Sequence, residues 1–447
     1  MCVDFGSTFT KTALVDLAEA RIVAAASHPT TIETDVLDGL DACLAELAAA
    51  DPRVAEAEVR ACSSAGGGLR IAVVGNEELV TAEAGRRVAL SSGGKVVAVF
   101  AASRDDDLAQ VPACSPDVVL LTGGTDGGNA APLLACAADL VAGGWRGPVV
   151  VAGNVDAQGE VGAILERAGA PYVLAPNVVP RIGALTPEGA RAATREMFLA
   201  HVIGGKHLSA RADFTAMVRG ATPDVVLTGV ELLARGYGEV SGAGDVVVVD
   251  VGGATTDVHS VVEVDPDTAL TEEGLAREVV ASTPVTRTVE GDLGMRWSAP
   301  ATVAATGLEQ LAEAAARRHD DPAYLPDSDA EADIDEQVAR AAVGLALRRH
   351  AGRSRVVVSP EGRVVERTGK DLRDVRLLVG SGGVLRNGRP GVADRVLAGS
   401  VGPDLEGGWQ LPRAARVVVD RDYVLAAAGL LAAEHPTVAA RLLTGLH

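Results

Sequence analysis

Aromatic side chains are scarce in this sequence: Phe, Trp and Tyr make up only 3% of its 447 residues. The hydrophobic fraction is nevertheless 48%, so small aliphatic side chains must supply the core. No apolar run approaches the roughly 20 residues that a membrane-spanning helix requires, and the longest covers residues 424–433. The N-terminal residues also lack the charged and then apolar pattern of a signal peptide. We therefore expect a cytoplasmic protein with no membrane partner.

Cysteine and positive charge are also in short supply. The cysteines number five and form no CxxC pair, which argues against a disulfide framework, a zinc site or an iron–sulfur site. With 40 Lys and Arg residues against 60 Asp and Glu residues, the net charge is −20. Such a surface repels nucleic-acid phosphates, so we expect no nucleic-acid partner. The acidity is otherwise interpreted as a solubility trait.

A long stretch in the first half of the chain alternates in an α/β manner. Apolar strands are expected at residues 71–74, 96–100, 118–121, 149–152 and 172–175, with helices at residues 133–141 and 160–168. Continuous β-branched runs are typical of strands buried on both faces, so we predict a doubly wound parallel, Rossmann-like insertion. Glycine-rich turns at residues 63–68 and 122–129 could bind an anion, although ordinary strand-to-helix turns also need glycine.

Two short segments, one in each half of the chain, match each other. Residues 4–11 read DFGSTFTK and residues 250–257 read DVGGATTD, so Asp, Gly and Thr fall at the same positions in both. Each copy follows an apolar strand and precedes another, at residues 12–17 and 258–264. Duplicated β-hairpins of this kind predict two related half-domains.

The residue types in the two loops suit a polyphosphate and its metal ion. Glycine lets the backbone approach closely, consecutive turn amides form a nest for an anion, and Ser and Thr hydroxyl groups add donors. An Asp at the end of a strand holds Mg²⁺, usually through water. There is no Walker GxxxxGK[ST] loop and no Rossmann fingerprint here. We therefore predict ATP and Mg as cofactors, with Asp4 and Asp250 as metal-binding residues and Asp4, Asp250 and Asp257 as catalytic carboxylates.

A third glycine-rich turn, GSGG at residues 380–383, follows a short apolar strand at residues 377–379. Its flat backbone could lie against an adenine and a ribose, and a simple tight turn is the alternative interpretation. The nucleotide-binding residues that we expect are Gly6, Ser7, Thr8, Thr10, Lys11, Gly252, Gly253, Ala254, Thr255, Thr256, Gly380, Ser381, Gly382 and Gly383.

These three elements, in this order, resemble the superfamily of acetate kinase, sugar kinases, heat-shock chaperones and actin. The resemblance implies an actin-like ATPase fold, with two ribonuclease-H-like half-domains around a nucleotide cleft. The first half would span residues 1–240, including the α/β insertion at about 59–185, and the second half would span residues 241–447.

Members of this superfamily have two connecting helices that cross at a hinge through small residues. In this sequence the helix expected at residues 224–234 contains Gly229, and the final helix at residues 422–433 contains Gly429. The resemblance therefore implies that these helices meet, with the final helix crossing back to the hinge.

Within the superfamily, the resemblance is closer to the GlmL/MutL family, which is associated with glutamate mutase. It is carried by residues 4–11, 122–129, 250–257, 288–296 and 379–383. The most family-specific stretch includes Glu290, Asp292 and Arg296, which could line the cleft, face a partner or form ordinary salt bridges. Members are regarded as reactivating or chaperone-like factors for adenosylcobalamin-dependent mutases. The implied partners are therefore cobalamin-dependent mutase subunits.

Three functions are compatible with this resemblance. A nucleotide-driven chaperone would be a slow Mg-dependent ATPase whose cleft closure acts on a mutase. A small-molecule kinase would need a base or a charged clamp for its acceptor, and only Asp257 is placed to serve. A filament-forming relative would need a self-complementary surface that sequence does not reveal. We expect the chaperone.

An acidic, proline-containing stretch at residues 317–337 follows the second loop. Its first part is predicted to be a solvated loop, followed by a helix at residues 338–347. A metal site is the alternative interpretation of this charge run.

Overall fold

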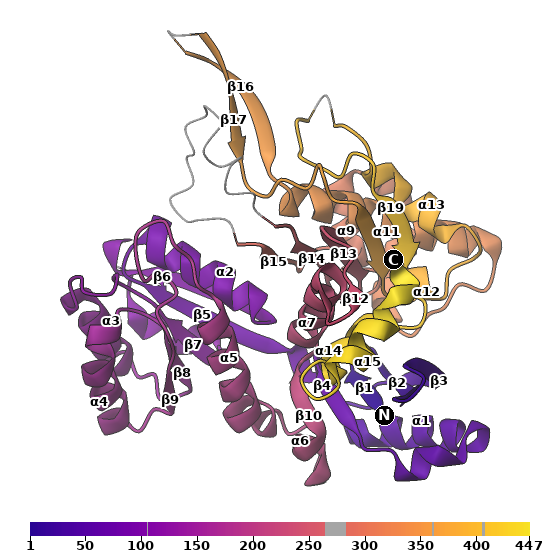
Figure 1. The fold of residues 1–447 in the computed structure, drawn as a ribbon, viewed down its shortest axis with the longest axis horizontal. Coiled ribbons are helices and arrows are strands. Elements are labelled where there is room, and N and C mark those ends of the chain that lie inside the picture. The colour runs from indigo at the N-terminus through magenta and orange to yellow at the C-terminus, as the bar shows by residue number, and fades with distance from the viewer. Residues whose placement is uncertain (105, 264–282, 360–361, 405–406) are drawn as a thin grey trace.

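Two of the sheets in this computed structural model match each other strand by strand (Figure 1). The structure describes residues 1–104, 106–263, 283–359, 362–404 and 407–447. The first sheet has the order β10-β4-β1-β2-β3 and the second the order β15-β14-β13-β18-β19. The first comprises β1 (Cys2–Phe5), β2 (Phe9–Asp16), β3 (Arg21–Pro29), β4 (Arg60–Ser63) and β10 (Val218–Ala221). The second comprises β13 (Val246–Val251), β14 (Thr256–Val261), β15 (Val285–Glu290), β18 (Leu377–Ser381) and β19 (Arg416–Val419).

The strand directions match as well as the order. The central strands β1 and β13 each pair antiparallel with the next strand along the chain and parallel with the strand on their other side. The outer strands repeat the pattern, because β2–β3 and β14–β15 are antiparallel while β4–β10 and β18–β19 are parallel. The strand expected at residues 258–264 forms as β14, which ends at Val261, and residue 264 lies outside the described residues. The two sheets are thus two copies of one topology.

A third five-stranded sheet lies, in sequence, between β4 and β10. Its order is β6-β5-β7-β8-β9, and every neighbouring pair is parallel. It comprises β5 (Leu69–Gly75), β6 (Gly94–Ala101), β7 (Val118–Leu121), β8 (Val149–Val151) and β9 (Tyr172–Leu174), which confirms the expected strands. We call residues 69–174 the inserted unit.

Helices cover both faces of the inserted sheet, as expected for strands that are apolar on both sides. On one face pack α2 (Glu83–Ser91) and α5 (Glu188–Met197), and on the other pack α3 (Ala131–Ala142) and α4 (Gln158–Ala168). Within the described residues, no helix has the length and apolar character needed to cross a membrane.

Two helices cross between the matched sheets, α7 (Thr222–Arg235) and α14 (Val424–Leu431). A Cβ atom placed on Gly229 of α7 would lie 2.2 Å from the carbonyl oxygen of Leu425, and one on Gly429 of α14 would lie 2.0 Å from that of Val225. Each glycine therefore admits the backbone of the other helix, which confirms the predicted close approach.

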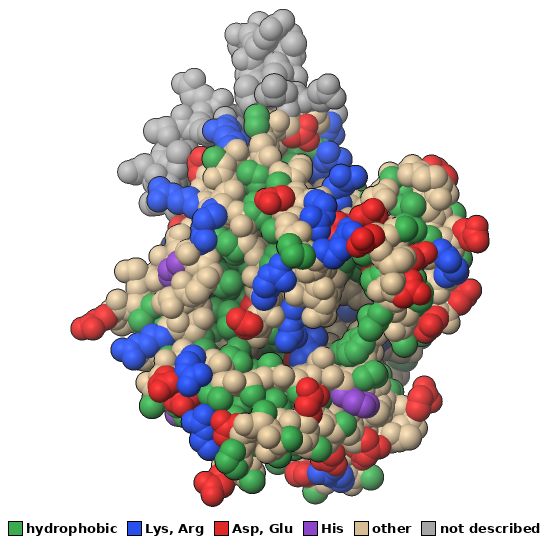
Figure 2. Space-filling model, turned by 90° about the vertical axis from the view of Figure 1, so that its right-hand side faces the viewer, with side chains coloured by type: hydrophobic (Ala, Val, Ile, Leu, Met, Phe, Trp, Pro, Cys, Tyr) green, Lys and Arg blue, Asp and Glu red, His purple; other side chains and the backbone are tan. Residues whose placement is uncertain are grey.

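The acidic stretch is helical where a loop was expected. The helix α11 begins at Asp329 and runs to His350, and α10 (Ala312–Asp320) precedes it. Asp335 pairs with the fully buried Arg318 at 2.6 Å, while Glu336 accepts hydrogen bonds from Arg389 and Arg395. Acidic and basic side chains are interspersed in the view of Figure 2. The solvated-loop prediction was wrong for residues 317–320 and 329–337, because Arg318 within the stretch and the distant Arg389 and Arg395 neutralise its carboxylates.

Candidate functional site

The two loops predicted to bind phosphate have the same hydrogen-bond frame. The amide of Gly6 donates to the carbonyl oxygen of Phe9 at 3.1 Å, and the amide of Gly252 donates to that of Thr255 at 2.9 Å. A Cβ atom on either glycine would lie at or within 3.0 Å of the same carbonyl, so glycine is required by the turn in both copies. A Cβ atom on Gly253 would also lie 3.6 Å from Oγ1 of Thr8. The two turns therefore lie against each other.

One residue, Thr30, donates hydrogen bonds to two carbonyl oxygens of the first loop. Oγ1 of Thr30 donates to the carbonyl oxygen of Gly6 at 2.8 Å, and the amide of Thr30 donates to that of Thr8 at 2.9 Å. Among the described residues, no acceptor binds the amides of Ser7 or Thr8. The loop thus turns its acceptors inward and leaves two successive donors free.

The second loop is supported in the same way by the family-specific segment. The amides of Met295 and Arg296 donate to the carbonyl oxygens of Gly252 and Gly253 at 2.9 and 2.8 Å. Oγ of Ser298 donates to the carbonyl oxygen of Ala254 at 2.6 Å. Within the described part of the chain, the amides of Gly253 and Ala254 meet no acceptor. Successive free amides in a turn form a nest for an anion.

Asp4 lies at the end of β1 and is only 3% exposed. Its carboxylate accepts hydrogen bonds from Oγ1 of Thr222 at 2.6 Å, the hydroxyl of Tyr423 at 3.0 Å and Nζ of Lys11 at 3.2 Å. Thr222 begins α7 and Tyr423 directly precedes α14, so this carboxylate ties the first loop to both crossing helices. Tyr423 has a φ of 57°, a conformation that costs a non-glycine residue of order 1–3 kcal/mol.

Asp250 occupies the equivalent place in the second half, but with a different environment. Burial raises the pKa of its carboxyl to about 6, and Lys11 opposes this shift. Asp257, Asp4 and Asp420 raise the pKa further through their negative charges. The arrangement therefore concentrates carboxylates around one lysine and is electrostatically suited to receive a cation.

Asp257 and Lys11 occupy the same position in their respective loops. Lys11 pairs across the hairpin with Asp4, and Asp257 pairs across with Asp250. Lys11 binds its carboxylate partner, whereas Asp257 faces a like charge and is bound instead by Arg287 at 2.7 Å. Oδ2 of Asp257 accepts a further hydrogen bond from Oγ1 of Thr255 at 3.3 Å.

Thr10 and Thr256 lie apart from the other predicted residues. Both are fully buried, since successive strand residues face opposite sides of a sheet and their neighbours Lys11 and Asp257 face the site. Oγ1 of Thr10 lies 3.4 Å from Oγ1 of Thr30. Both threonine side chains therefore lie in the core, and Thr10 contacts the residue that binds the carbonyl groups of the first loop.

The third glycine-rich turn lies beside the second loop. Ser381 pairs in parallel with Asp250, and a Cβ atom on Gly382 would lie 2.2 Å from the carbonyl oxygen of Val251. The open side of Gly380 is filled by leucine side chains, whereas no atom lies within 4 Å of a Cβ atom on Gly383. Of the four residues, Gly383 therefore offers the open backbone surface.

The charged residues of the family-specific segment separate into two ion-pair groups. Glu290 and Asp292 both bind Arg349, at 2.7 and 2.6 Å. Arg296 binds Asp335 at 3.1 Å. Three interpretations of these residues were compatible with the sequence: they could line the cleft, face a partner or form salt bridges. The structure shows salt bridges.

The two other glycine-rich turns belong to the inserted unit and its border. In the turn at residues 122–129, the amide of Gly127 donates to Asp156 at 2.8 Å, and Asp126 accepts from Asn177 at 2.8 Å. Carboxylates of the protein thus occupy donors that an anion would need. In the turn at residues 63–68, the amide of Ser64 donates to the carbonyl oxygen of Phe5.

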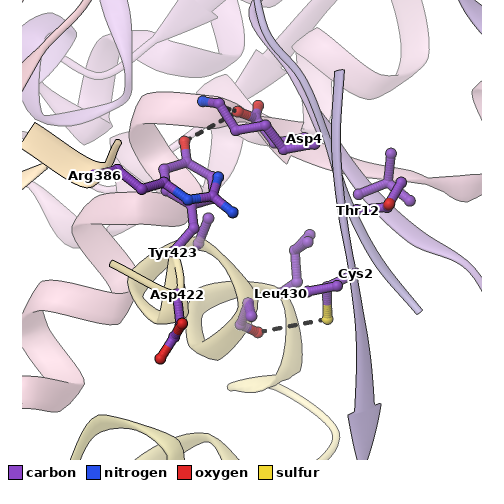
Figure 3. A pocket seen from close by; sticks show the side chains of 12 residues that line it. Cys2, Asp4, Thr12, Arg386, Asp422, Tyr423 and Leu430 are labelled. Atoms are coloured by element: carbon purple, nitrogen blue, oxygen red, sulfur yellow. Dashed lines mark hydrogen bonds and ion pairs between the residues drawn. The ribbon is translucent and has the colours of Figure 1, made fainter. Parts of the chain in front are cut away.

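A narrow pocket opens beside Asp4 (Figure 3). The ring of Tyr423 forms one wall, with Nζ of Lys11 at 4.1 Å and the guanidinium of Arg386 at 5.7 Å from its centre. Asp422 lies at the same end, and Cys2 and Leu430 line the opposite end. No local sequence pattern indicates Tyr423, Thr222 or Thr30 as site residues, because each reaches its loop from a distant segment.

The fold and the site define a class of α/β protein with two matched halves whose glycine turns lie against each other. The family model of the MutL protein matches residues 1–446 of the chain. Protein MutL of Clostridium tetanomorphum is 35% identical over 459 residues, covering 99% of this chain and 98% of that protein. The chain belongs to the MutL family, which confirms the resemblance seen in the sequence.

Among solved structures, a nucleotide-free acetone carboxylase matches 66% of this chain and 48% of its own chain, at 16% sequence identity. The TM-score of 0.33 is too low to define a shared fold.

Proposed function

We propose that this protein is a slow Mg²⁺-dependent ATPase with an actin-like architecture. Two ribonuclease-H-like half-domains, residues 1–240 and 241–447, would close on the nucleotide. The matched strand order and directions of the two sheets support this division. The observation that carries the proposal is the pair of facing turns, each with two successive amides that have no acceptor within the described part of the chain.

The residues at the turns fit a magnesium nucleotide. Free amides of Ser7, Thr8, Gly253 and Ala254 suit phosphate oxygens. Among the described residues, no group of three or more His, Cys, Asp or Glu side chains could hold a metal ion by itself. Mg²⁺ typically takes one or two carboxylates together with nucleotide phosphates and water. Bound ATP would supply the phosphoryl group, and its Mg²⁺ ion would supply the positive charge that offsets the carboxylates.

Each side chain has a separate role in this proposal. Asp4 and Asp250 would hold water on the metal from the two sides, and Lys11 would neutralise charge near the phosphates. Asp257 would orient the attacking water, because it ends the second loop with its carboxylate fixed by Arg287. Gly383 would leave room for the nucleoside.

ATP hydrolysis would change the conformation of this protein at the hinge, and that change would act on a partner protein. Asp4 contacts residues at the start of both crossing helices, so a change at its carboxylate can reach the hinge. A small-molecule kinase, in contrast, needs a base free to accept a proton. Asp257, the residue considered above as that base, and Glu290 are both bound by arginines. This favours the nucleotide-driven chaperone over the kinase.

We further propose that the partner is a cobalamin-dependent mutase such as glutamate mutase. Membership of the MutL family supports this choice. The test incubates the protein with ATP, Mg²⁺ and an inactivated adenosylcobalamin-dependent glutamate mutase, and measures mutase activity after fresh cofactor is added. ATP-dependent recovery that is lost in Asp250→Ala is the expected result. No recovery, together with stoichiometric phosphoryl transfer to a metabolite, would establish the kinase instead.

A further inference from the structure

One buried arginine joins the second loop to the inserted unit. Nη2 and Nε of Arg287, on β15, donate to Oδ1 of Asp257 at 2.7 and 3.1 Å. Nη1 of the same side chain donates to the carbonyl oxygens of Leu90 at 3.1 Å and Gly94 at 3.3 Å. Those carbonyls lie in α2 and at the start of β6, across the junction between the second sheet and the inserted unit.

The surroundings leave this guanidinium little freedom. Its side chain is only 3% exposed, and α2 packs directly against β15 (Figure 1). A buried charge without its partners is strongly destabilising. Movement of α2 away from β15 would therefore either break the hydrogen bonds from the guanidinium to Leu90 and Gly94 or draw the guanidinium away from Asp257. The position of α2 and the geometry of Asp257 are therefore linked through one side chain.

The first loop shows that such a link is not required by the turn itself. There, the equivalent position holds Lys11, which binds Asp4 within its own hairpin. In the second loop, Asp257 faces Asp250 and needs a cation from outside the hairpin. The cation that it receives is anchored to the inserted unit.

We propose that Arg287 is a positioning residue that couples the inserted unit to the nucleotide site through Asp257. When α2 lies against β15, Arg287 holds the carboxylate of Asp257 in place for water attack. When a partner on the inserted unit shifts α2, the carboxylate loses that orientation and hydrolysis slows. This inference rests on the proposed function and adds the route by which a partner regulates it.

The test measures ATP affinity by calorimetry, steady-state turnover, and hydrogen–deuterium exchange of residues 88–96 with and without Mg-ATP. In the wild-type protein Mg-ATP should slow exchange in this segment. Arg287→Met should keep ATP affinity within roughly threefold, lower turnover roughly tenfold or more, and abolish the exchange response. Arg287→Lys has one nitrogen and cannot reach both sets of partners. It should recover part of the turnover while the exchange response stays lost.

Arg318→Met is the matched control, because Arg318 is also buried and ion-paired but binds Asp335 and Glu331, away from the inserted unit. It should leave the exchange response intact. If both Arg287 variants keep the response, the coupling is overturned. If the wild-type protein binds no ATP, the proposed function fails, and nucleotide-free Asp257→Asn decides the coupling separately. Faster exchange of residues 88–96 supports the coupling, and unchanged exchange refutes it.

Discussion

The two glycine turns of this protein have the same backbone design and opposite electrostatics. Both use an amide-to-carbonyl bond across the turn, both have their carbonyl oxygens bound by donors from other segments, and both have two successive amides without an acceptor in the ranges that the structure describes. In the first, Lys11 satisfies Asp4 inside the hairpin; in the second, Asp257 faces Asp250 and depends on Arg287. The two turns therefore share one backbone geometry. They differ at the position of Lys11 and Asp257, and this difference makes Asp257 depend on a cation from outside its hairpin.

The largest expected effect comes from the two strand-end aspartates. Asp4→Asn and Asp250→Asn should each lower ATP turnover roughly a hundredfold, because each removes one side of the metal clamp. Asn keeps the shape of the side chain, so the loss reports charge. Turnover and calorimetry with Mg-ATP provide the measurement. Tight binding by the double variant would show that the two loops do not share one nucleotide.

The same pair should change stability in opposite directions without nucleotide. Asp250→Asn should raise the free energy of unfolding by up to about 3 kcal/mol at neutral pH, because it removes a partly buried carboxylate among like charges. Asp4→Asn should lower it by about 1–3 kcal/mol, since three donors lose a charged acceptor. Urea unfolding of both variants gives the comparison, and changes of equal sign would refute it.

The pH dependence of stability follows from the same carboxyl. The pKa of Asp250 in the folded protein, about 6, lies above its ordinary value of 3.8, so the folded state keeps a proton that the unfolded chain releases. Its stabilising contribution is complete below about pH 4 and is lost as pH rises through 6. Asp420, whose pKa burial also raises to about 6, acts in the same direction. Asp250→Asn should flatten part of this slope, and an unchanged slope would contradict the assignment.

The crossing of α7 and α14 tests how the two matched halves are joined. Gly229→Ala and Gly429→Ala should each lower the free energy of unfolding by roughly 1–3 kcal/mol, because each added Cβ meets a backbone carbonyl of the other helix. The larger Gly229→Leu should reduce ATP turnover more than ATP affinity. Gly344→Ala in α11 is the control: no atom lies within 4 Å, so it should stabilise the helix by about 0.5–1 kcal/mol. Equal effects at all three sites would refute the close crossing.

The smallest expected effects come from the residues that support each loop from behind. Thr30→Val and Ser298→Ala each remove a hydroxyl that donates to a loop carbonyl. Each should weaken ATP binding by about 1 kcal/mol, or roughly fivefold. A competition assay with a fluorescent nucleotide resolves this difference. A loss in only one variant would mean that the two turns do not bear equally on the ligand.

Local patterns in the sequence were sufficient for much of the framework. The repeated DxG segments located both turns, and apolar runs located the strands of the inserted sheet and the helices that contain Gly229 and Gly429. The partners of the site were not predictable in this way. Tyr423 reaches Asp4, and Arg287 reaches Leu90, only because the chain folds back on itself. The acidic stretch was mispredicted because its charge pattern does not reveal the pairing of its carboxylates with Arg318 inside the stretch and with the distant Arg389 and Arg395.

We propose above all that the two glycine turns together bind one magnesium nucleotide. Residue-resolved amide exchange, with and without Mg-ATP, measures this most directly, because the amides of Ser7, Thr8, Gly253 and Ala254 have no acceptor among the described residues. We expect exchange at all four amides to slow together, and only when Mg²⁺ and ATP are both present. Slowing in one turn alone, or at residues 122–129 with both turns unchanged, would contradict it.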